Sequence, residues 1–300
     1  MVRVRDLPLH DGRTLRVHDS ADGAVGEGGT DRGSADASDD GDGADVTGAL
    51  TVLWFHGSPQ TGAPLKPLLR AAGECGIRLV SYGRPSCGGS SPQPGRSVGS
   101  AAVDVQQLAD ALGVERLAVM GASGGGPHAL ACAALLSERV VAVACLATLA
   151  PYGADGLDWF DGMACDGASL RAAVRGRTVR AEYEHTAEFD PSSFVERDYA
   201  ALDGDWSSLG ADVGRAGVAG PDGLIDDDLA YVAPWGFDVT DVTAPVLLVH
   251  GGSDRVVPPT HSEWLLRRLP DAELWVRPRD GHISVLDACP VAFDWLRARW

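Results

Sequence analysis

The chain has 300 residues, 45% hydrophobic and 22% charged, which suffices for a globular core in one domain or in one domain with an insertion. Its net charge of −17 argues against nucleic acid or an anionic membrane surface as a partner, since both are polyanions. Six cysteines without C-x-x-C spacing, no apolar leader in residues 1–6 and no apolar run of about 18 residues predict a soluble, cytoplasmic protein.

The N-terminal part combines a hairpin pattern with an acidic segment. Residues 2–7 and 13–18 alternate apolar and polar side chains around a turn, which predicts a hairpin at a sheet edge. Residues 20–46 consist mainly of Gly, Ala, Asp and Ser and carry much of the negative charge. We predict a disordered insertion there, because the segment buries too little apolar surface to offset its ordering entropy. A calcium loop starting at Asp36 is the alternative, but it would need glutamate where Thr47 stands.

Apolar, β-branched runs then alternate with amphipathic stretches. Residues 50–55 form a continuous apolar run, typical of a strand buried on both faces of a parallel sheet. The alternation predicts a doubly wound, mostly parallel α/β sheet, whose ligands bind beyond the carboxyl ends of the strands. The predicted strands are 50–55, 78–82, 117–120, 140–150, 245–249 and 273–276, and the predicted helices are 64–72, 98–112, a segment ending at 136, 260–269 and 284–299.

The alternation stops between residues 152 and 238. Helical patterns remain at 169–188, 194–202 and 224–232, together with scattered aromatic residues. We predict a helical cap of residues 152–238, inserted after the sixth strand into a core of residues 1–151 and 239–300. Because the cap must leave and re-enter at the carboxyl edge of the sheet, its aromatics should roof the substrate pocket, with Trp159 and Phe160 as first candidates.

The stretch from Leu117 to Leu130 contains the most informative motif. Gly121-Ala122-Ser123-Gly124-Gly125 matches G-x-S-x-G, and it stands between a predicted strand and a predicted helix, which is the context of a nucleophile elbow. Glycine at 121 and 125 has a steric reason, because bulk on either side of a strained Ser123 would collide with the neighbouring chain. The serine would lie at a helix N-terminus, where free N–H groups stabilise developing negative charge.

Two other interpretations of this turn stand beside the elbow. The stretch Gly124 to Ala129 matches the dinucleotide fingerprint G-x-G-x-x-A, but Pro127 falls inside the phosphate loop and no acidic residue ends the next strand. No lysine follows, so a P-loop is excluded. A tight strand-to-helix turn without chemistry is the second interpretation, which the pentapeptide alone leaves open.

The rest of the chain resembles the α/β-hydrolase family, in its capped branch of serine hydrolases that includes proline iminopeptidases and cofactor-free haloperoxidase-like esterases. Four segments carry the resemblance in the family's order and span the chain apart from the acidic insertion and the cap. They are His56-Gly57-Ser58-Pro59, the loop at 84–92, the elbow, and Gly251-Gly252-Ser253-Asp254 followed by Gly281-His282. The resemblance implies an eight-stranded sheet and a catalytic triad in the order serine, acid, histidine.

The triad order selects Ser123, Asp254 and His282. A serine hydroxyl needs a base to become a nucleophile, and the imidazole of His282 titrates near neutral pH. Asp254 would fix the tautomer of this histidine and stabilise the imidazolium. The resemblance further implies that the backbone N–H groups of Gly124 and Ser58 form the oxyanion hole, and that the reaction uses no metal and no organic cofactor.

Other residues compete for some of these roles. Asp155 and Asp158 are the rivals of Asp254, since some relatives place the acid after the preceding strand. Among the other histidines, His128 and His250 are interpreted as packed, hydrogen-bonded side chains, and His56 as a structural residue of a turn.

The sequence therefore predicts a serine hydrolase that cleaves an ester or amide bond of a small apolar substrate through an acyl-enzyme. A carboxylic ester is favoured over an amide. One alternative is a haloperoxidase- or perhydrolase-like activity, with peroxide in place of water. Another is a proline iminopeptidase-type aminopeptidase, although Gly124 stands where those enzymes usually carry tryptophan. A ligand-binding protein that lost catalysis is the non-enzyme alternative, and the complete triad opposes it.

Overall fold

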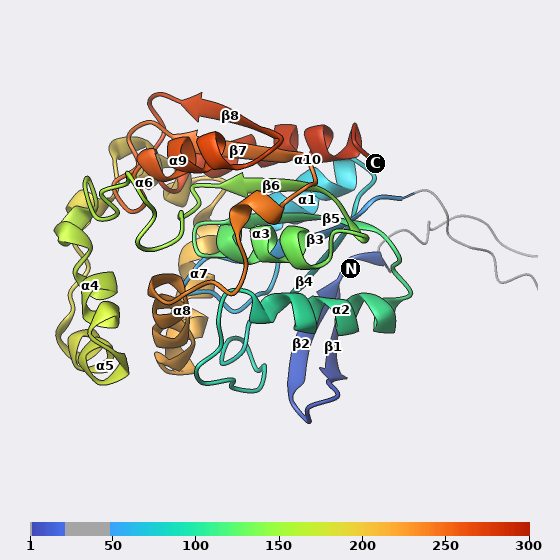
Figure 1. The fold of residues 1–300 in the computed structure, drawn as a ribbon, viewed down its shortest axis with the longest axis horizontal. Helices are drawn as coiled ribbons and strands as arrows, with labels where there is room; N and C mark the ends of the chain where they lie inside the picture. Colours follow the sequence, from blue (N-terminus) through green and yellow to red (C-terminus); the bar gives the residue numbers. More distant parts are fainter. Residues whose placement is uncertain (1, 22–48) are drawn as a thin grey trace, which may run out of the picture.

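The chain is built around one sheet (Figure 1). The computed structural model describes residues 2–21 and 49–300. The acidic insertion predicted at 20–46 lies outside the described residues from 22 onward. Eight strands follow the order β1-β2-β4-β3-β5-β6-β7-β8. The strands are β1 (Arg3–Pro8), β2 (Thr14–Asp19), β3 (Thr51–Phe55), β4 (Arg78–Tyr82), β5 (Leu117–Ala122), β6 (Val140–Leu146), β7 (Val246–Gly251) and β8 (Ala272–Arg277).

The sheet is mostly parallel, as predicted. Strand β2 pairs antiparallel with both β1 and β4, which gives the predicted N-terminal hairpin at the sheet edge. The pairs from β4 through β8 in sheet order are all parallel. Parallel neighbours need crossover connections, and the intervening helices provide them. The eight-stranded, doubly wound α/β prediction is confirmed.

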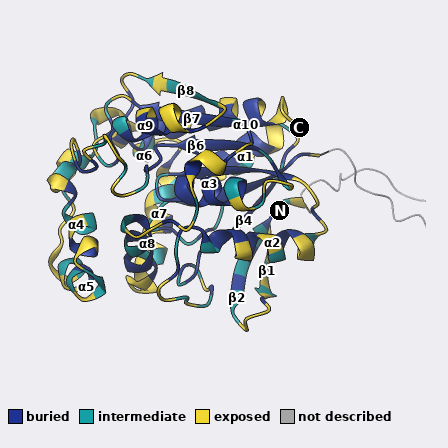
Figure 2. Ribbon diagram, viewed as in Figure 1, coloured by how far each residue is buried: buried dark blue, intermediate teal, exposed yellow. Residues whose placement is uncertain are grey.

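Helices cover both faces of the sheet, and the side-chain alternation of each strand divides the core in two. In β3, Leu53 and Phe55 join one apolar cluster, whereas Val52 and Trp54 join the other. Figure 2 shows the sheet as the buried centre of the molecule. The first cluster includes residues of α2 (Ser100–Leu112), α3 (Gly125–Leu135) and α9 (Thr260–Arg268), and the second includes residues of α1 (Lys66–Glu74) and α10 (Cys289–Arg297).

Five further helices lie between β6 and β7, beyond the carboxyl ends of the parallel strands (Figure 1). We call residues 147–245 the inserted segment. Both chain ends lie on the other side of the molecule, so the edge under these helices is free for a site. The helices are α4 (Ala168–Val174), α5 (Arg177–Thr186), α6 (Glu196–Asp203), α7 (Ser207–Val218) and α8 (Asp222–Val232).

The structure differs from the sequence prediction in three details. The helical pattern at 169–188 is two helices, because Gly176 takes a φ of 104° between them. Helix α7 was not predicted, since three glycines lower its helix propensity. The predicted strand 140–150 ends at Leu146, where the chain turns over the sheet edge. Within the described residues, no helix has the length and apolar character needed to cross a membrane.

Candidate active site

The turn between β5 and α3 has the geometry of a nucleophile elbow. Ser123 adopts a φ of 53°, a left-handed conformation that is strained for a residue with a side chain. A Cβ at Gly121 would collide with the backbone of Gly125, and one at Gly125 would collide with the carbonyl of Phe55. The steric reason predicted for these two glycines is confirmed.

Three loops at the carboxyl edge bring Ser123, His282 and Asp254 together. His282 follows β8, and its Nε2 lies 2.9 Å from the Oγ of Ser123. The Nδ1 of His282 lies 2.8 Å from the Oδ2 of Asp254, which follows β7. The other carboxylate oxygen of Asp254 accepts the backbone N–H groups of Val256 and Val257 at 2.9 and 3.0 Å. The rival acids Asp155 and Asp158 are exposed, whereas Asp254 is buried against His282.

The electrostatics of this group favour a basic histidine held by an ionised acid. Burial alone would raise the pKa of Asp254, but the neighbouring His282 and His250 outweigh it and lower the pKa far below its ordinary value. Burial lowers the pKa of His282, but the carboxylates of Asp254 and Asp198 outweigh it and raise the pKa above 6.5. Asp254 therefore stays ionised near neutral pH, and the pKa of His282 lies above its ordinary value.

The histidines interpreted as structural are buried and hydrogen-bonded. His56 contacts the carbonyl of Gly57 through Nδ1 at 2.7 Å and accepts the N–H of Arg84 at Nε2, 3.1 Å away. His128 contacts the carbonyl of Gly124 at 2.9 Å, and burial lowers its pKa to about 3. His250 contacts Ser262 and the carbonyl of Val257. Burial also lowers the pKa of His56 well below its ordinary value, so His56 and His128 are neutral in the folded protein. All three side chains hold loops around the site.

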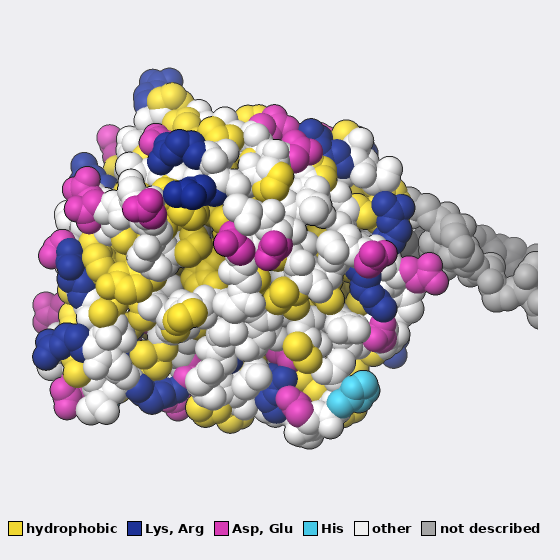
Figure 3. Space-filling view, in the orientation of Figure 1, with side chains coloured by type: hydrophobic (Ala, Val, Ile, Leu, Met, Phe, Trp, Pro, Cys, Tyr) yellow, Lys and Arg dark blue, Asp and Glu magenta, His cyan; other side chains and the backbone are white. Residues whose placement is uncertain are grey.

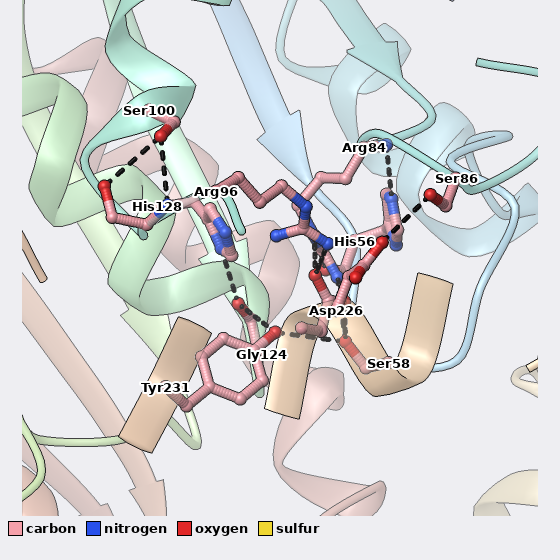
Figure 4. A network of polar contacts seen from close by, with 12 residues as sticks. His56, Ser58, Arg84, Ser86, Arg96, Ser100, Gly124, His128, Asp226 and Tyr231 are labelled. Carbon is pink, nitrogen blue, oxygen red and sulfur yellow. Dashed lines mark hydrogen bonds and ion pairs between the residues drawn. The ribbon is translucent and has the colours of Figure 1, made fainter. Parts of the chain in front are cut away.

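The turn that carries Ser58 lies against the elbow. The Cβ position of Gly57 would be 3.6 Å from the Cβ of Ser123. Figure 4 shows the Ser58 hydroxyl directed into a polar network, where Arg84 donates to it at 2.8 Å and Tyr231 lies 3.1 Å away. The hydroxyl of Ser58 is thus held within this network.

The small size of Gly124 has a structural cause. A Cβ at this position would collide with the hydroxyl of Tyr231 and approach the Oγ of Ser58. The tryptophan common in proline iminopeptidases could not fit here without moving α8. Gly124 thus allows the 56–59 turn and the elbow to approach each other.

A cavity of about 440 Å³ opens over Ser123 and His282. Hydrophobic side chains gather on the left part of the face in Figure 3, where Figure 1 places the inserted helices. Among the described residues, those lining the cavity include no Asp, Glu, Lys or Arg. The apolar walls come from the core and from the inserted segment: Trp54, Pro59, Leu65, Phe189, Phe194, Leu202, Trp206, Leu209, Val213, Val256, Ile283 and Leu286.

The structure corrects the predicted place of Trp159 and Phe160, which do not line this cavity. The indole N–H of Trp159 donates to the carbonyl of Ala150 at 2.8 Å, and its ring packs edge-on against His261 of α9. Phe160 packs on Trp159 and carries the Arg171 guanidinium 4.0 Å above its ring. Both aromatics therefore close the core beside β6, and later residues of the inserted segment line the cavity.

Several residues that line the cavity were not predicted from the sequence. Leu209 and Val213 lie on α7, the helix that was not predicted. Three further lining residues are aromatics of the inserted segment, and their spacing in the sequence does not distinguish them from Trp159. They are Phe189, Phe194 and Trp206. In residues 2–21 and 49–300, no group of three or more His, Cys, Asp or Glu side chains could hold a metal ion.

A strand–elbow–helix unit with a serine, a histidine and an aspartate at the carboxyl edge of such a sheet defines the class of α/β hydrolases. A family model described as the alpha/beta hydrolase fold matches residues 51–288 of this chain. The protein belongs to the alpha/beta hydrolase family.

Individual relatives are distant. A Synechocystis sp. protein assigned as a non-heme chloroperoxidase is 23% identical over 266 residues, 85% of this chain and 89% of the relative. An esterase from Thermogutta terrifontis has a TM-score of 0.66 at 20% identity, covering 99% of this chain and 98% of that one. A bromoperoxidase from Bacillus anthracis has a TM-score of 0.64 at 19% identity, covering 98% and 96%. At these identities the solved structures show the shared fold.

Proposed function

We propose that this protein is a serine hydrolase that cleaves carboxylic esters of small, uncharged, apolar acids through an acyl-enzyme. The observation that carries the proposal is the chain of contacts from Asp254 through His282 to the Ser123 hydroxyl, which opens into an uncharged cavity. This arrangement has the parts that acyl transfer requires, namely a nucleophile, a base and a group that orients the base.

The proposed reaction has two halves. Nε2 of His282 takes the proton of Ser123 while Oγ attacks the ester carbonyl, and the imidazolium then gives that proton to the departing alcohol. Water, deprotonated by the same nitrogen, attacks the acyl-enzyme and releases the acid and the serine. In both halves the negative carbonyl oxygen would accept the N–H groups of Gly124 and Ser58, and Asp254 stabilises the imidazolium.

The cavity walls indicate the class of substrate. A buried charge without a partner is strongly unfavourable, so a cavity lined by apolar and neutral side chains rejects ionised acyl groups. Its volume of about 440 Å³ lies within the usual range for small-molecule sites. We propose that the inserted segment acts as a cap whose α6 and α7 residues define the acyl-binding wall.

Labelling with a fluorophosphonate probe tests the proposal directly. The probe phosphonylates an activated serine, and mass spectrometry should locate a single adduct on Ser123. Labelling of the purified protein should be absent after Ser123→Ala. An adduct on another serine, or no adduct in folded protein, would contradict the proposed nucleophile.

Perhydrolysis is a second candidate, favoured by the chloroperoxidase and bromoperoxidase assignments among the similar proteins. Hydrogen peroxide would replace water as the attacking group on the acyl-enzyme and would release a peracid. Bromination of a dye in the presence of acetate, hydrogen peroxide and bromide measures this activity, because the released peracid oxidises bromide to the brominating species. A rate with peroxide far above the rate of ester hydrolysis would make perhydrolysis the principal function.

The pH dependence of kcat/KM should follow His282. The base must be neutral to accept a proton, so activity should fall as the pH drops through the pKa of His282 in the free enzyme. Because that pKa is raised above 6.5, the acid limb should have its midpoint above pH 6.5. Initial rates on a p-nitrophenyl ester between about pH 5 and 9 give the profile. A midpoint below 6.5, or a flat profile, would contradict this role.

Leu209→Trp should shorten the acyl groups that the enzyme accepts. The larger ring would fill part of the cavity, and each excluded methylene is worth about 1–3 kcal/mol in discrimination. We expect the ratio of octanoate to acetate turnover on p-nitrophenyl esters to fall at least about tenfold, with acetate turnover nearly unchanged.

Val218→Trp is the matched control for this change. Val218 lies on the same helix, is 91% exposed and does not line the cavity. Its variant should keep the wild-type ratio. An unchanged ratio in a folded Leu209→Trp protein would show that the acyl group binds elsewhere.

A further inference from the structure

Three buried aspartates connect the inserted segment to the loops of the site. They are Asp198 on α6, Asp212 on α7 and Asp227 on α8, each at most 1% exposed. A buried carboxylate loses its hydration, and hydrogen-bond or charge partners in the protein must replace it. In all three cases the partners include a core loop that borders Ser123 or carries His282.

Asp198 binds the loop of the catalytic histidine with both carboxylate oxygens. Oδ2 accepts the backbone N–H groups of Val195 and His282 at 3.1 and 3.2 Å. Oδ1 accepts the N–H groups of Ile283 and Ser284 at 2.9 and 2.8 Å, and the Ser284 hydroxyl at 2.7 Å. These N–H groups lie where a short helix begins at Ser284, a place that favours negative charge.

The other two aspartates hold the turn on the opposite side of the elbow. Asp227 accepts the Ser58 hydroxyl and lies between the guanidinium groups of Arg84 and Arg96. Figure 4 shows Arg84 reaching the same turn, and its N–H groups also donate to the carbonyls of His56 and Gly57. Burial opposes the charge of Asp227, but the two arginines outweigh it and keep its pKa well below the ordinary value.

Asp212 completes this side. It accepts the N–H and the hydroxyl of Thr61 at 3.1 and 2.6 Å, just after the turn that carries Ser58. Helices α6 and α7 thus have two roles: their side chains line the cavity, and their aspartates bind the loops below it.

We propose that helices α6, α7 and α8 hold the reacting groups in place, in addition to the cavity walls that α6 and α7 supply, and that Asp198 is a positioning residue for His282. This inference rests on the proposed hydrolase function. Asp198 touches neither the substrate nor the reacting atoms, and it acts by fixing the backbone from 282 to 284 on which the imidazole stands. A misplacement of about 1 Å at a reacting group can reduce a rate by about 10²-fold. Loss of the Asp198 contacts should therefore lower kcat.

Asp198 also contributes charge. The charged groups around the His282 loop are Asp254, which contacts the ring, Asp198, which accepts the backbone N–H, and Asp280, which forms ion pairs with Arg197 and Arg277. The negative charge of Asp198 raises the pKa of His282. Removal of this charge therefore shifts the acid limb of the pH profile to lower pH, which a purely structural contact would not do.

Asp198→Asn separates these effects from fold stability. The amide can still accept at one oxygen, but its NH₂ group would face the N–H groups of Val195 and His282. We expect kcat on p-nitrophenyl butyrate to fall about 10- to 100-fold, with KM within about threefold and the acid limb moved to lower pH. Asp203→Asn, an exposed aspartate on the same helix, is the control and should leave all three unchanged.

Ser284→Ala provides a second variant that keeps the charge. It removes one donor to Asp198 and one acceptor for the N–H of Gly281, so kcat should fall several-fold while the acid limb stays in place. If Asp198→Asn unfolds by circular dichroism, this variant decides. In a folded Asp198→Asn protein, wild-type kcat and an unmoved acid limb would overturn the positioning role. If that variant is unfolded, wild-type kcat in folded Ser284→Ala would overturn it. Failure of the hydrolase proposal is recognised separately, by ester hydrolysis that survives Ser123→Ala.

Discussion

Ser123→Ala should abolish nearly all hydrolysis of p-nitrophenyl butyrate, a loss on the order of 10³-fold or more. The change removes the oxygen that lies 2.9 Å from Nε2 of His282 and leaves the cavity unchanged. Ser137→Ala tests whether loss of a hydroxyl matters in general, because Ser137 is exposed just beyond the far end of the helix that begins at the elbow. That control should retain the wild-type rate. Full activity in Ser123→Ala would remove the central proposal.

The double variant distinguishes a catalytic pair from two independent residues. His282→Ala should reduce the rate about as much as Ser123→Ala, because the hydroxyl is a poor nucleophile without its base. Residues that act as a unit give strongly non-additive losses, so the double variant should be only slightly worse than either single one. Losses that multiply would indicate that the two side chains act separately.

The core elements could be predicted because buried parallel strands leave an unambiguous pattern. Every residue of β3 is buried, and all but Thr51 are apolar, which is the pattern of a strand in a sheet covered on both faces. The elbow could also be predicted, since only a residue without Cβ fits at Gly121 and Gly125. Steric requirements of this kind are local in sequence and can be inferred without knowing what packs nearby.

The cavity wall could not be predicted in the same way. Trp159 and Trp206 are both buried tryptophans of the inserted segment, yet only Trp206 lines the cavity. Trp159 is held by the carbonyl of Ala150 and by His261, contacts that depend on how the segment crosses the sheet edge. Helix α7, with its three glycines, is stable because Leu209 and Trp206 pack against the core, and such tertiary contacts override local propensity.

The aspartate run at 226–228 shows the same limit for charge. Three successive carboxylates on a helix suggest a solvated face, whereas all three are buried here. Each has an arginine partner distant in sequence: Arg177 for Asp226, Arg84 and Arg96 for Asp227, and Arg180 for Asp228. These pairs cannot be assigned from a single sequence, because nothing in the sequence distinguishes the arginines that bind these aspartates from the other arginines of the chain.

Asp254→Asn should be the most instructive of the conservative changes. In the native arrangement Nδ1 of His282 carries a proton toward Oδ2 of Asp254, which leaves Nε2 free to accept the proton of Ser123. The asparagine keeps the acceptor for Val256 and Val257 but presents an NH₂ group to Nδ1. The imidazole must then carry its proton on Nε2, where it cannot act as a base. We expect kcat to fall on the order of 10⁴-fold with the fold intact.

Asp158→Asn is the control that makes this result specific. Both changes remove one negative charge from the region after a parallel strand, but Asp158 is exposed and belongs to the rival position for the acid. It should retain ester hydrolysis within about twofold, since an exposed charge perturbs a buried site weakly. Circular dichroism and thermal unfolding establish that both variants are folded. If Asp158→Asn lost activity while Asp254→Asn kept it, the acid of the triad would lie after β6, and the contact at 2.8 Å between Asp254 and His282 would be structural.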